Sequence, residues 1–101
     1  MEKLKIEVPM DELAAFCKRH HIRRLAFFGS VLRDDFTPES DVDVLVEFEP
    51  DARVGLITFA GIENELSKLL GRKVDLNTAG FLSPYFRDEV LRGAEAAYEQ
   101  A

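Results

Sequence analysis

The chain has 101 residues, 47% of them hydrophobic, which is enough for one domain with its own core and too little for two. Its 19 acidic and 13 basic residues give a net charge of −6, which disfavours a role in gripping the backbone of long nucleic acids. The single cysteine, Cys17, excludes an internal disulfide framework and a cysteine-based metal cluster.

Neither a membrane-spanning segment nor an export signal is predicted. No stretch approaches the run of about 18 apolar residues that a transmembrane helix needs. The amino terminus, Met1-Glu2-Lys3-Leu4-Lys5, leads into a charged segment rather than into the apolar h-region of a secretory signal. We therefore expect a cytoplasmic protein in which residues 1–101 form a single domain, acting alone or within a homo- or hetero-oligomer.

The first predicted element is a helix that begins near Pro9 and ends near His20. Proline and the two acidic residues that follow it are typical of a helix start. Apolar residues then recur at helical spacing, at Leu13, Phe16 and Cys17. A basic run, residues 18–24, follows, and we interpret it as cations that complement the helix dipole, with a phosphate-binding or partner-binding patch as the alternative.

A strand and a tight turn are predicted next. The apolar run Leu25-Ala26-Phe27-Phe28 predicts a strand over about 24–28, and Gly29-Ser30 opens a short helical stretch to about Arg33. Such a turn can aim backbone N–H groups and a serine hydroxyl at a phosphate. In the alternative interpretation, Ser30 only caps the short helix.

A turn-rich loop, 34–40, leads into a second predicted strand over about 42–48. Alternate side chains of a strand share a face, so Asp41 and Asp43 lie on one face, roughly 6 to 7 Å apart along the chain. Two carboxylates this close repel each other unless a cation lies between them. Magnesium prefers oxygen ligands and commonly bridges protein carboxylates to phosphates, so the pair predicts a magnesium site.

The second half of the chain predicts a helix followed by a short strand. Apolar residues at steps of three and four favour a helix over about 56–70, and Gly71 is a common helix stop. The strand, over about 73–77, places a third carboxylate, Asp75, between two apolar residues. The alternative for Asp75 is a solvent-facing residue on an edge strand.

The carboxyl-terminal part predicts a turn at 78–80 and another helix, opened by Ser83-Pro84 and ending near Gly93. The pattern over 94–101 fits either a helix or a short last strand. The order of these elements favours an α+β (α/β) fold, with helices packed on a small mixed β-sheet.

Two segments, Gly29-Ser30-Val31-Leu32-Arg33 and Ser40-Asp41-Val42-Asp43-Val44-Leu45-Val46, together resemble the signature of the minimal nucleotidyltransferases, the MNT family of the DNA polymerase beta-like superfamily. The likeness covers nearly the whole chain. It implies the nucleotidyltransferase fold, ATP and Mg²⁺ as ligands, and transfer of an adenylate group to an acceptor. It also implies a partner, because small prokaryotic members resemble the antitoxins of HEPN/MNT toxin–antitoxin pairs, whose toxin is a HEPN-domain RNase.

The resemblance also implies residue roles. Gly29, Ser30, Arg33 and Ser40 would form the nucleotide-binding part of the site. The catalytic carboxylates, Asp41, Asp43 and Asp75, would bind two Mg²⁺ ions, one lowering the pKa of the attacking hydroxyl and the other stabilising the departing pyrophosphate. The sequence departs from the pattern after the motif arginine, where Asp34 stands in place of the glycine of many members.

Two of the nucleotide-site assignments have structural alternatives. The side chain of Arg33 could instead form an ion pair with a nearby carboxylate such as Asp34 or Asp35. The hydroxyl of Ser40 could form a local hydrogen bond within its turn.

The function that the resemblance favours is an ATP-dependent protein adenylyltransferase that silences a partner toxin, with a tyrosine hydroxyl as the acceptor. The alternative is a non-catalytic antitoxin that neutralises its partner by complex formation, with exposed apolar residues such as Phe81 or Tyr85 as the surface. Transfer to RNA ends or to an antibiotic is less favoured, because such enzymes normally carry an additional acceptor domain and negative charge hinders the approach of RNA.

Overall fold

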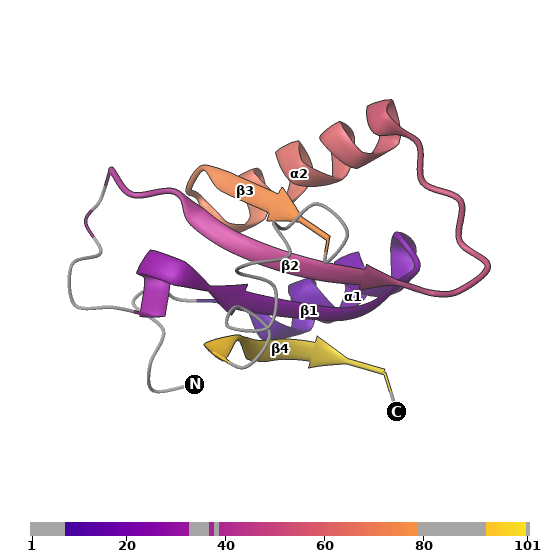
Figure 1. Cartoon of the computed structure of the whole chain (residues 1–101), viewed down its shortest axis with the longest axis horizontal. Coiled ribbons are helices and arrows are strands. Elements are labelled where there is room, and N and C mark those ends of the chain that lie inside the picture. Colours follow the sequence, from indigo (N-terminus) through magenta and orange to yellow (C-terminus); the bar gives the residue numbers. More distant parts are fainter. Residues whose placement is uncertain (1–7, 33–36, 38, 79–92, 101) are drawn as a thin grey trace.

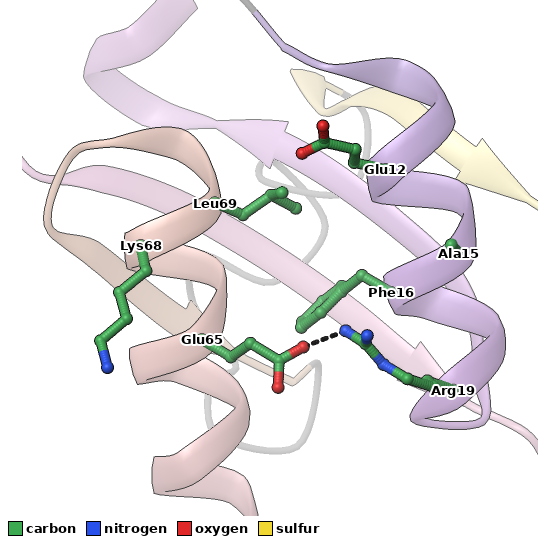
Figure 2. A pocket seen from close by; sticks show the side chains of 7 residues that line it. All are labelled: Glu12, Ala15, Phe16, Arg19, Glu65, Lys68 and Leu69. Atoms are coloured by element: carbon green, nitrogen blue, oxygen red, sulfur yellow. Dashed lines mark hydrogen bonds and ion pairs between the residues drawn. The ribbon is translucent and has the colours of Figure 1, made fainter.

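A four-stranded mixed sheet organises the part of the chain that the computed structural model describes, residues 8–32, 37, 39–78 and 93–100. The strands lie in the order β3 (Val74–Asn77), β2 (Val42–Phe48), β1 (Ile22–Phe28) and β4 (Glu95–Glu99). Helices α1 (Met10–Arg19) and α2 (Leu56–Leu70) lie side by side against one face of the sheet (Figures 1 and 2). The predicted fold class is thereby confirmed. In these described residues, no helix combines the length and the apolar character that crossing a bilayer would need.

Helix α1 spans Met10–Arg19 and follows the prediction closely. Acidic residues occupy its first turn and basic residues its last, which complements the helix dipole at both ends. Its buried residues are the three that the spacing predicted: Leu13, Phe16 and Cys17. The helix therefore packs on the sheet through one apolar stripe.

The basic run 18–24 is largely paired with acidic residues of neighbouring elements. Glu65 of α2 contacts both Arg19 and His20, and Glu49 contacts His21. Glu47 pairs with two arginines of the run, with Arg23 at 3.2 Å and with Arg24 at 3.5 Å. These contacts favour a structural role for the basic run over a dedicated phosphate-binding patch.

Strands β1 (Ile22–Phe28) and β2 (Val42–Phe48) form the centre of the sheet and run antiparallel. Strand β1 begins two residues before the predicted start, because Ile22 is fully buried and already pairs with Phe48 of β2. The core side of β2 carries Val42, Val44 and Val46, each at most 1% exposed. The opposite side carries Asp43, as alternation along a strand requires.

Helix α2 (Leu56–Leu70) leads directly into β3 (Val74–Asn77). The helix ends as predicted at Gly71, which takes the left-handed conformation (φ 68°) that glycine adopts without a Cβ clash. Strand β3 then pairs parallel with β2. Buried Ile62 and Leu66 on α2 complete the core between the helices and the sheet.

Strand β4 (Glu95–Glu99) resolves the alternative left open for residues 94–101, because it pairs antiparallel with β1. Its backbone closes the side of the sheet that lies opposite β3 (Figure 1). The predicted turn beyond Thr78 and nearly all of the helix predicted from Ser83-Pro84 lie outside the described residues.

Candidate active site

Two carboxylates from different parts of the chain lie beside each other on the sheet. The parallel register of β2 and β3 pairs Asp43 with Asp75. Paired residues of neighbouring strands, which lie about 4.8 Å apart, point their side chains to the same face. The neighbours of Asp75 in β3, Val74 and Leu76, are buried in the core, so both aspartates belong to the face that the helices leave uncovered.

Asp41 lies at the entrance to the same strand. It is two residues before Asp43 and immediately precedes β2, where the amide of Val42 donates a hydrogen bond to the carbonyl of Lys73 (2.9 Å). The Asp41 side chain is 48% exposed, and one of its carboxylate oxygens lies 4.0 Å from Nζ of Lys73. An exposed pair at this distance contributes little to stability, which is compatible with a role for Asp41 in binding a ligand.

The glycine of the turn after β1 lies against the carboxylate of Asp43. Gly29 has φ 74°, and a Cβ built on it would come within 2.3 Å of Oδ2 of Asp43. The antiparallel register, which pairs Phe28 with Asp43, accounts for this approach. Fully buried Val31 anchors the 3-10 turn η1 (Gly29–Leu32) to the core, so the turn is held beside the aspartate.

The donor set suits a hard divalent cation. Asp41, Asp43 and Asp75 offer carboxylate oxygens, the ligands that Mg²⁺ prefers. Within the described ranges, no group of three or more His, Cys, Asp or Glu side chains is arranged to hold a metal ion. The backbone register of Asp43 and Asp75, together with the approach of Gly29, is therefore what points to a site on this face.

Comparison with known proteins identifies the family. Residues 10–96 match the nucleotidyltransferase domain family. The chain belongs to this family. Protein adenylyltransferase MntA of Thermococcus cleftensis is 37% identical to this nucleotidyltransferase over 75 residues, which cover 74% of each protein.

Solved structures support the same assignment. One described as a minimal nucleotidyltransferase superposes with a TM-score of 0.69 and 36% sequence identity, covering 84% of this chain and 85% of the other. The Shewanella oneidensis MNT antitoxin in complex with a tri-AMPylated HEPN toxin also belongs to the set of similar structures. That match has a TM-score of 0.64 and 16% identity, covers 90% of this chain and 70% of the other, and shows that the two chains share a fold.

The structure describes only some of the residues that were predicted to bind the nucleotide. Ser30 lies in η1, where its backbone belongs to the turn beside Asp43, while its side chain and all of Arg33 lie outside the described residues. The Ser40 hydroxyl accepts a hydrogen bond from the amide of Thr37 (3.0 Å) and lies 3.1 Å from its Oγ1. This is the local hydrogen bond that the alternative interpretation of Ser40 expected. A role for Ser40 in binding the nucleotide remains a prediction.

Two polar residues of this nucleotidyltransferase that the sequence patterns did not reveal hold the strand of Asp75. The amide of Leu76 donates to Oε2 of Glu63 (2.8 Å), and the amide of Val74 donates to Oγ of Ser67 (3.0 Å). Glu63 and Ser67 are four residues apart and so lie on one side of α2. A sequence signal for them does exist, because each directly follows one of the two buried residues of α2, Ile62 and Leu66.

A hollow of about 480 Å³ lies elsewhere, between α1 and α2 (Figure 2). Phe16 and Leu69 form part of its floor, and the ion pair of Arg19 with Glu65 spans it. Because the helices cover the sheet face opposite to the aspartates, this hollow is separate from the candidate active site.

The thiol of Cys17, whose pKa is clearly shifted, also lies away from the aspartates. Burial of Cys17 in the core raises the pKa of its thiol to about 12. A thiol that stays protonated at neutral pH is a poor nucleophile. Cys17 is therefore a packing residue.

Proposed function

We propose that this chain is the antitoxin of a toxin–antitoxin pair and transfers AMP from ATP to a hydroxyl group of a HEPN-type RNase toxin. The observation that carries the proposal is the pairing of Asp43 with Asp75 beside the Gly29 turn. The family and the likeness to an MntA adenylyltransferase support the reaction type. The complex of an MNT antitoxin with a tri-AMPylated HEPN toxin supports the partner.

Each part of the site has a distinct task in this proposal. The turn at Gly29 and Ser30 presents backbone N–H groups to the triphosphate, while Asp41, Asp43 and Asp75 hold Mg²⁺. Bound Mg²⁺ would lower the pKa of the attacking hydroxyl and offset charge on the departing pyrophosphate. The protein contributes mainly by positioning, because phosphoryl transfer needs little covalent help from side chains. ATP as the donor fits a cytoplasmic protein.

The proposal is tested by measuring the intact mass of the toxin. The purified chain is incubated with the product of the neighbouring gene, ATP and Mg²⁺, and this product, the toxin of the proposal, is expected to gain the mass of one or more adenylate groups. Asp43→Asn should abolish the gain. Asp51→Asn, a matched change at an exposed aspartate in the turn after β2, should leave it intact. A toxin of unchanged mass with the unsubstituted chain would reject the proposal.

A second candidate function, neutralisation by complex formation without transfer, has one observation in its favour. Two large aliphatic residues at the start of α2, Leu56 and Ile57, are 81% and 92% exposed, as residues of a protein-binding surface often are. The residues first expected to form such a surface, Phe81 and Tyr85, lie outside the described part. If the double variant Asp41→Ala, Asp43→Ala protects cells from the toxin as well as the unsubstituted chain does, binding alone is the function.

A further inference from the structure

The outer edge of β3 is held by side chains rather than by another strand. In the described sheet, β3 lies at one edge, with β2 on its inner side. The amides of Val74 and Leu76 bond instead to Oγ of Ser67 and to Oε2 of Glu63. These two amides flank Asp75 on either side in the sequence, so the carboxylate sits on a stretch of backbone fixed at two points.

Ser67 also fixes the connection that leads into the strand. Its carbonyl accepts a hydrogen bond from the amide of Arg72 (3.1 Å), and its hydroxyl donates to the carbonyl of Glu63 (2.9 Å). The same hydroxyl therefore links Glu63 to Val74. One residue thus ties the end of α2 to the start of β3 across the tight turn at Gly71.

A short edge strand needs such support. Strand β3 has four residues and, among the described strands, pairs with β2 alone. Unsatisfied amides at the edge of a sheet are also able to pair with other chains. The bond from Leu76 is directed at a carboxylate, and bonds of this charge-assisted kind are about twice as strong as neutral ones. Two side chains of α2 thus bind the outer edge of the strand that carries Asp75.

We propose that Glu63 and Ser67 are positioning residues, which hold β3 from its outer edge so that Asp75 is presented to the divalent cation together with Asp43. The inference rests on the proposed function, because it takes Asp75 as a metal ligand. Neither residue touches the nucleotide in this account. Each acts through the backbone on both sides of Asp75.

The first experiment measures the backbone directly. Amide hydrogen exchange is followed by NMR in the unsubstituted chain, in Glu63→Ala and in Glu63→Gln. Exchange at Leu76 should accelerate about tenfold in the alanine variant, the change expected when one charge-assisted bond is lost. It should return toward the original rate in the glutamine variant, whose side-chain oxygen can still accept the bond. Unchanged exchange at Leu76 in Glu63→Ala would overturn the inference.

The second experiment measures metal affinity. Binding of Mn²⁺ to the chain with a non-hydrolysable ATP analogue is followed by electron paramagnetic resonance. Loss of a group that orients a metal ligand typically weakens binding 10- to 100-fold, so Glu63→Ala should weaken Mn²⁺ binding by about tenfold, and Ser67→Ala should act in the same direction. Glu63→Gln should restore most of the affinity, which a general loss of stability would not explain.

Glu65→Ala is the matched control. It removes the same kind of side chain from the same helix and breaks contacts with α1, yet it faces away from β3. Its Mn²⁺ affinity should match that of the unsubstituted chain. Unchanged Mn²⁺ affinity in Glu63→Ala would overturn the inference alone. Absence of Mn²⁺ binding in the unsubstituted chain would overturn the proposed function and this inference with it.

Discussion

Gly29 lies in the turn after β1 and Asp43 lies in β2, yet they are so close that a Cβ on the glycine would be 2.3 Å from the aspartate Oδ2. Only a residue without a side chain fits this gap, and only glycine adopts a φ of 74° without strain. The contact joins the turn proposed to hold phosphate to a carboxylate proposed to hold metal.

Gly29→Ala is therefore expected to damage both stability and AMP transfer. The left-handed conformation alone costs an alanine ~1–2 kcal/mol, and the clash with Asp43 would push the turn away from the carboxylate. Urea unfolding and the toxin mass assay measure the two effects.

Gly61→Ala is the control for this substitution. Gly61 lies inside α2, and apart from the backbone of its own helix no atom of the described residues comes within 4 Å of the position that a methyl group on it would take, so alanine there should stabilise the chain by ~0.5–1 kcal/mol. Its transfer activity should be unchanged. A Gly29→Ala variant that matched Gly61→Ala in both assays would contradict the role assigned to the turn.

Asp75→Asn is expected to separate stability from activity. Like charges directly opposite each other in a sheet are destabilising, so removing one charge of the Asp43–Asp75 pair should leave the free energy of unfolding equal or slightly higher without divalent cations. Transfer of AMP should fall sharply, because a carboxylate ligand is lost.

Unfolding in urea with and without Mg²⁺ and ATP analogue measures this prediction. The unsubstituted chain should gain stability from the ligands, as any molecule that binds only the folded state stabilises it. Asp75→Asn should gain less. Equal gains in the two proteins would argue that Asp75 is the solvent-facing edge residue of the alternative interpretation.

Cys17 predicts a dependence of stability on alkaline pH. Its thiol has a pKa of about 12 in the fold against 9.0 for the exposed group, so the unfolded chain releases this proton first. The contribution of the buried, neutral Cys17 thiol to the free energy of unfolding is present in full below about pH 9, and it is lost as the pH rises from 9 toward 12.

Comparison with Cys17→Ala isolates this contribution from that of other titrating groups. The free-energy advantage of the unsubstituted chain over the variant should shrink as pH rises above 9. A constant difference between about pH 8 and about pH 11 would contradict the burial of a neutral thiol. Slow alkylation of Cys17 at neutral pH is a further expected result.

The elements with strong local signals could be predicted from the sequence. The apolar stripe of α1, the stop of α2 at Gly71 and the alternation of β2 each depend on residues close together in the chain. The family signature then predicted that Asp75 would lie near Asp43. The register confirms that neighbourhood for the backbone, while the metal and nucleotide roles of the site residues remain predictions.

Features that depend on distant contacts could not be predicted in the same way. The pairing of β4 with β1, the hold of Glu63 on β3 and the partners of the basic run all join residues that only the folded chain brings together. Ser40 shows the same limit, because spacing alone could not distinguish its bond to Thr37 from a contact with nucleotide.

The most direct test of the account is the intact mass of the partner toxin after incubation with the chain, ATP and Mg²⁺, measured in parallel for the unsubstituted protein and Asp43→Asn. We expect adenylate on the toxin with the first and none with the second. A toxin that acquires no adenylate, or acquires as much with Asp43→Asn, would contradict the claim that Asp43 and Asp75 form the centre of an adenylyltransferase.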